Sequence, residues 1–484
     1  MICPAAHWAS IAPDRPALFF DRDSWSYRKL DDEIRRWTSI LRQRGVGPGH
    51  RVGLVSANRP ELVAIFFACA RLRAAFAPLN VRLTGHEVAG LLARLAPELV
   101  IAEEQLADRT ADGEVLERLA AVNPRSEPSE REIEAESSFA ILFTSGTAGP
   151  AKAAELSFAN FRASAVFSAR NLGDDPRQRW LGCLPLYHVG GLAMATRCVL
   201  YGASLELQRG FREEAVVEAL SSGRITHFSL VDTTLHRLLD AWGQEYFPST
   251  VNAVLVGGGP VSSERLEQAR RPKLPVLATY GLTEATSQVA TERLGAADGQ
   301  TAGPGLDGVL LRVVTDDQQI AAPDQMGEIQ VSGPTVMRGY CHDPTATQNA
   351  FQGGWLRTKD FGSLDPRGRL RVIARRSDII ISGGENIYPA EIEKVLASHP
   401  RVLLAAVVGK KDDRWGQVPA AAVTVSGPVT EGELQAWCGE RLAGFKAPRE
   451  VLIVKDLPCD SIGKVNRVAT LALFSEKPGS SNRW

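Results

Sequence analysis

Apolar residues recur along the first three hundred positions in two alternating patterns. Short apolar runs are typical of buried strands, and stretches in which apolar residues return every three or four positions are typical of helices. The alternation predicts parallel sheets flanked by helices. The predicted strands are 51–56, 77–80, 98–102, 139–143, 181–184, 204–207, 227–231, 253–256 and 276–279, and the predicted helices are 26–44, 60–70, 158–169, 191–200, 213–220, 235–242 and 263–271.

The pattern changes after about Gly308. Short pieces separated by Asp, Gly and Pro follow, which predicts a small β subdomain over about 308–377. A compact α+β unit then covers 378–484. We therefore expect an α/β fold with an N-terminal domain over 1–377 and a separate C-terminal domain. The predicted pieces are strands 309–314, 327–331, 370–373, 403–408 and 420–425, and helices 389–397 and 431–442.

Composition narrows the class of protein. A chain of 484 residues exceeds what one core usually supports, and a formal net charge of -1 favours neither nucleic acid nor an anionic membrane. No apolar run reaches the length of a membrane span, and the first residues lack a signal-peptide pattern. We expect a cytoplasmic protein whose cysteines are reduced and buried. These are Cys3, Cys69, Cys183, Cys198, Cys341, Cys438 and Cys459.

The stretch FAILFTSGTAGPAK places a buried strand directly before a glycine-rich loop. Two glycines let backbone N–H groups converge on an anion, hydroxyls add donors, and a lysine adds a cation. The spacing is not that of a Walker A loop, so P-loop kinases and ATPases are disfavoured. On composition alone a Ser/Thr/Gly surface turn stays equally open. The candidate phosphate ligands are Thr144, Ser145, Gly146, Thr147, Gly149 and Lys152.

Further motifs follow in order along the chain. They are PLYHVGGL (Pro185 to Leu192), YGLTE (Tyr280 to Glu284), RTKDFG (Arg357 to Gly362), RRSDIIISGGENIYPAEIE (Arg375 to Glu393) and DSIGKVNR (Asp460 to Arg467). Together with the glycine-rich loop they resemble the adenylate-forming acyl-CoA synthetases over nearly the whole chain. The resemblance implies an AMP-forming acid–thiol ligase that uses ATP, Mg²⁺ and coenzyme A. Such an enzyme converts a carboxylic acid to an acyl-adenylate and then to a thioester.

The resemblance also assigns nucleotide ligands. Gly257, Gly258 and Gly259 would lie against adenine together with Tyr280 and Gly281, Thr283 would contact phosphate, and Glu284 would bind Mg²⁺. Asp360 would take the ribose hydroxyls, and Arg375 would reach ribose or phosphate. Two positions depart from the family pattern, because Lys359 and Ala374 stand where glycines are usual.

In the C-terminal domain, Lys464 would be the catalytic cation that bridges the carboxylate and the phosphate. Asp378 would be the hinge about which the small domain rotates after adenylation. Gly383 and Gly384 would line the pantetheine channel.

His188 in PLYHVGGL is the candidate residue of the acyl pocket, although a satisfied packing histidine is the alternative. The segments LNVRLTGHE, ITHFSLVDTTLHRLL and TYGLTEATSQVAT resemble the 2-succinylbenzoate–CoA ligases of menaquinone biosynthesis, with Ser287 and Gln288 the most telling and Asp232 replacing a common proline. Ser287 would then bind an aromatic dicarboxylate. Benzoate, medium-chain and malonyl ligases, an enzyme loading a carrier-protein thiol, and a luciferase-type oxidase stay open, as does a homo-oligomer.

Overall fold

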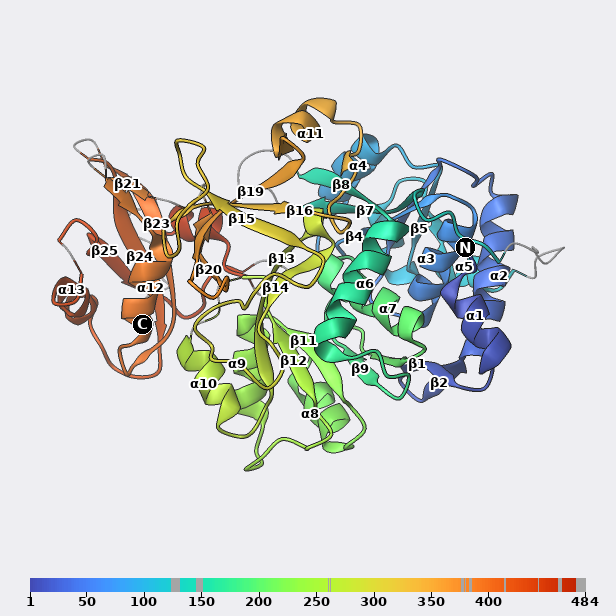
Figure 1. The fold of residues 1–484 in the computed structure, drawn as a ribbon, viewed down its shortest axis with the longest axis horizontal. Helices are drawn as coiled ribbons and strands as arrows, with labels where there is room; N and C mark the ends of the chain where they lie inside the picture. The colour runs from blue at the N-terminus through green and yellow to red at the C-terminus, as the bar shows by residue number, and fades with distance from the viewer. Residues whose placement is uncertain are drawn as a thin grey trace. The chain divides into compact units, whose positions relative to one another are not determined.

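The computed structural model describes residues 1–122, 131–144, 151–259, 261, 263–375, 378, 380–382, 385–412, 415–442, 444–459 and 464–475 (Figure 1). Its contacts divide the chain into two units. Unit 1 comprises Met1–Leu311 and Gln330–Arg357, and unit 2 comprises Arg312–Ile329 and Thr358–Trp484. The two units are defined by packing contacts, whereas the predicted hinge at Asp378 is defined by motion. The domain boundary at 377 therefore stays a prediction.

A seven-stranded sheet holds the glycine-rich stretch. Its inner strands are parallel, and the last two on one side, β8 and β17, run antiparallel to their neighbours. The spatial order is β17 (Gly339–Tyr340), β8 (Lys152–Ser157), β7 (Ser138–Thr144), β4 (Ala75–Leu79), β3 (Arg51–Val55), β5 (Leu99–Ala102) and β6 (Glu114–Val115).

An eight-stranded sheet forms the second layer of unit 1. All its strands are parallel except β14 and β2, which are antiparallel additions at the two edges. The order is β14 (Ser287–Thr291), β13 (Val276–Leu282), β12 (Ala253–Val256), β11 (His227–Leu230), β9 (Arg179–Gly182), β10 (Ser204–Leu207), β1 (Pro16–Phe20) and β2 (Asp23–Ser26). The predicted parallel sheets are therefore confirmed.

Helices flank both sheets, as the periodicity predicts. They are α1 (Pro4–Ile11), α2 (Tyr27–Gln43), α3 (Pro60–Arg71), α4 (Gly85–Leu95), α5 (Leu116–Ala120), α6 (Phe158–Leu172), α7 (Val189–Tyr201), α8 (Glu213–Ser221), α9 (Asp232–Ala241), α10 (Ser263–Arg270) and α11 (Pro344–Ala350), with 3₁₀ turns η1 (Glu104–Arg109) and η2 (Thr283–Ala285). Hydrogen-bonded caps fix the starts of several helices. At α6, the Ser157 hydroxyl accepts from the Asn160 N–H, and the Asn160 side-chain oxygen accepts from the Ser157 N–H. Within the described residues, no helix is both long and apolar enough to cross a membrane.

An aromatic cluster lies beneath the strand that leads into the glycine-rich stretch. Phe139 of β7 stacks on Phe66 of α3 with ring centroids 3.9 Å apart. Phe158 and Phe161 of α6 meet Phe139 edge-on at 5.2 Å and 5.4 Å. Since burying one phenylalanine contributes about 1.5–3 kcal/mol, this cluster is a main anchor of β7.

The segment after Gly308 is β-rich, as its change of texture predicts. Its five-stranded sheet consists of β15 (Leu310–Val314), β16 (Gly327–Ser332), β19 (Trp355–Leu364) and β18 (Phe351–Gln352) in order, with β20 (Leu370–Arg375) also paired to β19.

A second five-stranded sheet belongs to unit 2. It consists of β22 (Glu385–Ile387), β21 (Ile380–Ser382), β24 (Gly416–Val425) and β23 (Val402–Asp412), with β25 (Glu450–Ile453) parallel to β24. The helices are α12 (Pro389–Ala397), α13 (Glu431–Gly439) and α14 (Arg467–Ala472), and Figure 1 shows α12 against the sheet. The predicted strand at 403–408 is too short, because the β23–β24 ladder continues through Lys410 and Lys411.

All seven cysteines are free thiols, and five of them are buried. The expectation of buried thiols is wrong for Cys459, which is exposed, and for Cys341, which is half-buried. Burial raises the pKa of the Cys183 thiol to about 12 and that of Cys438 to about 11, which leaves these groups inert.

Candidate active site

The glycine-rich stretch connects two antiparallel neighbours, β7 and β8. Thr144 and Lys152 are register partners, and the Thr144 hydroxyl donates to the Lys152 carbonyl over 3.4 Å. The candidate ligands Ser145, Gly146, Thr147 and Gly149 lie outside the described residues. The loop is therefore the connection of a β-hairpin, and its role in phosphate binding stays a prediction.

Tyr340 joins two of the predicted ligands. The Lys152 ammonium lies 5.0 Å from the centroid of the Tyr340 ring, and the Tyr340 hydroxyl donates to Glu284 Oε1 over 2.9 Å. The pairing of β17 with β8 places Tyr340 opposite Ala154, two residues from Lys152. Sequence reasoning missed Tyr340, because a lone tyrosine between a glycine and a cysteine carries no motif.

The turn after YGLTE has an unusual backbone. Thr286 and Ser287 have φ angles of 52° and 84°, in the left-handed region that non-glycine residues avoid. The Ser164 hydroxyl donates to the Thr286 carbonyl over 2.8 Å, and the Thr286 hydroxyl donates to the Thr335 carbonyl over 2.6 Å. Strain of this kind costs about 1–3 kcal/mol per residue and gathers at functional sites. The turn presents Thr283 and Glu284 half-buried.

The glycines assigned to adenine have packing reasons of their own. A Cβ on Gly257 would lie 2.5 Å from the Thr279 carbonyl oxygen, and one on Gly281 only 1.7 Å from that of Ser287. Gly258 and Gly259 are exposed, whereas the Tyr280 side chain is 8% exposed. These positions let β12, β13 and β14 approach closely, and contact with adenine stays a prediction.

A buried arginine lies beside the residues predicted to bind the acid. Arg197 of α7 is 2% exposed, and its Nη2 donates to Gln288 Oε1 over 2.9 Å. Its guanidinium lies 5.1 Å from the centroid of the Trp180 ring, and its Nε has no hydrogen-bond partner. Burial lowers the pKa of Arg197, and no carboxylate forms an ion pair with it among the described residues. A buried cation without a counter-charge suits an anionic ligand.

Sequence reasoning did not single out Arg197. The available signal was one charged residue within the otherwise apolar sequence LAMATRCVLY of a predicted helix.

His188 immediately precedes α7. Its N–H donates to the Pro185 carbonyl over 3.2 Å, its side chain is half-buried, and its ring lies 4.7 Å from that of Tyr187. The contacts fix its backbone and leave both its acyl-pocket role and the packing alternative as predictions.

Asp232 stands where the resembled ligases commonly have proline, and its place in the fold tolerates either residue. It is the first residue of α9, where proline is also favoured, and an acidic group there suits the helix dipole. Burial raises the pKa of Asp232, opposed by Arg265 at 3.7 Å.

In unit 2, the predicted ribose ligands are neighbours. Asp360 of β19 and Arg375 of β20 are register partners, and Asp360 is 5% exposed. The Asp360 N–H donates to the Thr358 hydroxyl oxygen over 3.1 Å. The side chain of Arg375 lies outside the described residues.

The two departures from the family pattern differ in their consequences. Ala374 lies within β20 opposite Phe361, so an ordinary strand residue is accommodated there. Lys359 has φ 62°, in the region where a glycine carries no steric penalty. This lysine therefore strains the backbone of β19 just before Asp360.

Asp378 is paired with the motif that carries Lys464. Its Oδ2 lies 3.1 Å from Arg467 Nε, and Arg467 Nη1 lies 2.6 Å from Glu393 Oε1. Lys464 is half-buried, and Gly383 and Gly384 lie outside the described residues. The hinge, the catalytic lysine and the pantetheine channel stay predictions.

Among the described residues, no group of three His, Cys, Asp or Glu side chains could hold a metal ion. Glu284 offers one carboxylate as a metal ligand, beside the Tyr340 hydroxyl. Mg²⁺ commonly binds proteins through one or two carboxylates together with substrate phosphates, so this donor suits magnesium delivered with a nucleotide.

Comparison with known proteins decides the family. The model of the AMP-binding enzyme family matches residues 5–341, and that of the AMP-binding enzyme C-terminal domain matches residues 391–464. This chain belongs to the AMP-binding enzyme family. The resemblance identified from the motifs is thereby confirmed.

Similar proteins indicate the subfamily to which this AMP-binding enzyme is most similar. A 2-succinylbenzoate–CoA ligase of Geobacillus kaustophilus is 39% identical over 471 residues, 95% of each chain. The o-succinylbenzoate CoA synthetase MenE of Bacillus subtilis, solved with its acyl-adenylate intermediate, superposes with a TM-score of 0.89 at 33% identity, covering 97% of this chain and 98% of that one. ATP-bound MatB of Rhodopseudomonas palustris superposes with a TM-score of 0.88 at 25% identity, covering 98% and 99%.

Tyr340→Phe tests the contact with Glu284. Removing one hydrogen bond to a carboxylate should raise the magnesium concentration for half-maximal ATP–pyrophosphate exchange about two- to tenfold, and Glu284→Gln should raise it further. Tyr246→Phe, at an exposed tyrosine, is the control. An unchanged magnesium titration in both site variants would refute the metal role of Glu284.

Lys359→Gly tests the strained backbone of β19 at Lys359. Relief of left-handed strain should stabilise the protein by about 1 kcal/mol, which raises the unfolding midpoint by about 1–3 °C in calorimetry. Lys394→Gly, within helix α12, should lower the midpoint instead. A fall in both variants would show that Lys359 makes compensating contacts.

Proposed function

We propose that this AMP-binding enzyme is a 2-succinylbenzoate–CoA ligase. It would form 2-succinylbenzoyl-adenylate from the acid and ATP, release pyrophosphate, and then transfer the acyl group to coenzyme A with release of AMP. The observation that carries the choice of acid is the buried Arg197, which forms no ion pair with a carboxylate of the described residues and donates to Gln288, the residue after Ser287. The named relatives support the same choice across nearly their whole length.

The acid has two carboxylates with different fates. One reacts, and the other must be bound without reacting, so a pocket for this acid needs a cation or donors that a monocarboxylate pocket lacks. Arg197 would supply that charge, and Ser287 would supply a hydroxyl from the strained turn. His188 would contact the acyl group from the start of α7.

The nucleotide would be bound by the ligands that the motifs predict. Thr144, Lys152, Thr283 and the glycine-rich loop would bind phosphates, and Asp360 and Arg375 would bind ribose. Glu284 would bind the magnesium ion, which neutralises phosphate charge when bound. A structure of the related MenE holds ATP and a magnesium ion. We place the reaction in the cytoplasm, where ATP and coenzyme A are available.

Preference for the acid is the first test. 2-Succinylbenzoate should exceed benzoate, octanoate and malonate by at least roughly a hundredfold in kcat/KM, because analogues leave buried polar groups unpaired. Ser287→Ala should erode this preference with little change in the KM for ATP, whereas Ser222→Ala, at an exposed helix end, should not.

Faster turnover of a simple aliphatic or benzoic acid would refute the choice of acid and favour another aryl or medium-chain ligase. Adenylation without thioester formation on coenzyme A would favour a carrier-protein thiol as the acceptor.

Lys464→Ala tests the two-step mechanism. Loss of the cation should slow adenylation by about 3–5 kcal/mol in activation free energy while thioester formation from supplied acyl-adenylate persists. The two half-reactions are measured separately by pyrophosphate release and by thioester detection. Lys455→Ala, an exposed lysine of the same unit, is the control. Equal loss in both half-reactions would exclude this role for Lys464.

A further inference from the structure

A buried asparagine joins the two sheets of unit 1 beside the acid-binding residues. Asn58 lies in the connection between β3 and α3 and is 1% exposed. Its Oδ1 accepts from the Leu186 N–H over 2.8 Å. Its Nδ2 donates to the Leu184 carbonyl over 2.9 Å and to the Gln208 carbonyl over 3.0 Å. One side chain thus satisfies backbone groups at the ends of β9 and β10.

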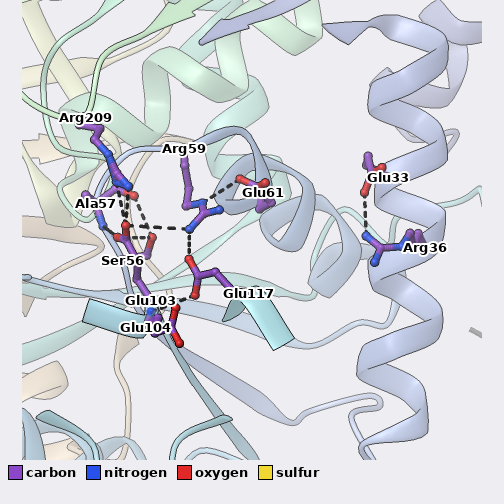
Figure 2. Close-up of polar contacts among 10 residues, drawn as sticks. All are labelled: Glu33, Arg36, Ser56, Ala57, Arg59, Glu61, Glu103, Glu104, Glu117 and Arg209. Carbon is purple, nitrogen blue, oxygen red and sulfur yellow. Dashed lines mark hydrogen bonds and ion pairs between the residues drawn. The ribbon is translucent and has the colours of Figure 1, made fainter. Parts of the chain in front are cut away.

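The connection that carries Asn58 is itself held by a buried carboxylate. Glu103 Oε2 accepts from the Ala57 N–H over 3.1 Å and from the Ser56 hydroxyl over 3.3 Å. Glu103 Oε1 accepts from Arg209 Nη1 over 2.7 Å, and Arg209 directly follows Gln208 (Figure 2). We refer to Asn58, Glu103 and Arg209 as the brace.

Further ion pairs extend the brace toward the surface. Arg59 Nε lies 2.8 Å from Glu61 and its Nη1 lies 2.5 Å from Glu117, whose other oxygen accepts from the Glu104 N–H over 2.9 Å (Figure 2). The residues on both sides of Asn58 are therefore fixed independently of Asn58 itself.

The bonds of Asn58 enclose the turn that leads to His188. Leu184 and Leu186 flank Pro185, whose carbonyl accepts from the His188 N–H over 3.2 Å. α7 begins at the next residue and carries Arg197 on its later turns. Since proline has no N–H of its own, Asn58 supplies hydrogen bonds on both sides of a residue that cannot donate one.

We propose that Asn58 is the positioning residue for the acid half of the site. It acts on the acid through the Leu184–His188 turn and the start of α7, without touching the acid. The inference rests on the proposed function, in that His188 and Arg197 are taken to face the acid. Misplacement by about 1 Å can reduce turnover about a hundredfold, so loss of these bonds should show in the adenylation rate.

The chain offers a matched control. Asn171, which is half-buried, makes two bonds of the same kind elsewhere in unit 1: its Nδ2 donates to the Glu292 carbonyl over 2.9 Å, and its Oδ1 accepts from the Leu294 N–H over 3.2 Å. It serves the loop after β14 and no residue assigned to the acid. Asn171→Ala therefore removes amide hydrogen bonds to backbone groups, two where Asn58→Ala removes at least three, without the proposed consequence.

The test compares Asn58→Ala, Asn171→Ala, His188→Ala and the double variant Asn58→Ala/His188→Ala in ATP–pyrophosphate exchange. Asn58→Ala should lower kcat/KM for the acid roughly ten- to hundredfold and leave the KM for ATP within about twofold. The double variant should lose little more than the worse single variant, because both changes act on the same group. Asn171→Ala should stay within about twofold of the wild type.

Arg209→Met gives a second route, because its side chain is 49% exposed and the variant should fold even if Asn58→Ala does not. It should reduce acid-dependent turnover in the same direction but less. Equal losses in the Asn58 and Asn171 variants, or multiplicative losses in the double variant, would overturn the proposal. The assay uses whichever acid the wild type activates best, so failure with 2-succinylbenzoate refutes the proposed function alone.

Discussion

The need to pair every buried backbone group dominates this structure where its two parallel sheets meet. Strands of both sheets end in loops whose N–H and C=O groups have no ladder partner, and such groups are costly when buried. Asn58 forms hydrogen bonds with such groups beyond the ends of β9 and β10, and Glu103 accepts from one beyond the end of β3. The positions of His188 and Arg197, which we propose to bind the acid, depend on these bonds because α7 starts from the turn that they hold.

The fold was largely predictable because hydrophobic periodicity follows from burial. The strand at 139–143 and the helix at 158–169 were located within a few residues of β7 and α6. The hydrophobic pattern does not predict helix α4, although Thr84 and Glu87 form a capping box at its start. Strands of two or three residues such as β17 and β21 were missed because pairing partners, not local pattern, determine them.

The site was predictable only where residues form motifs. Asp360 and Arg375 belong to separate motifs, and the structure makes them register partners. Tyr340, Arg197 and Asn58 were not predictable in this way. Each is a single residue whose role comes from long-range contacts, such as that between Tyr340 and Glu284. Several loop ligands lie outside the described residues, so their roles rest on the motif alone.

The hairpin that carries the glycine-rich loop restricts how this family can diverge. Thr144 and Lys152 are held opposite each other by the β7–β8 ladder, and successive side chains of a strand point to opposite faces. An inserted or deleted residue that shifted this register would move Lys152 away from the Tyr340 ring and expose the apolar face of β8. Insertions or deletions within β7 or β8 must therefore arise together with compensating changes that restore this register, whereas single substitutions can leave it intact.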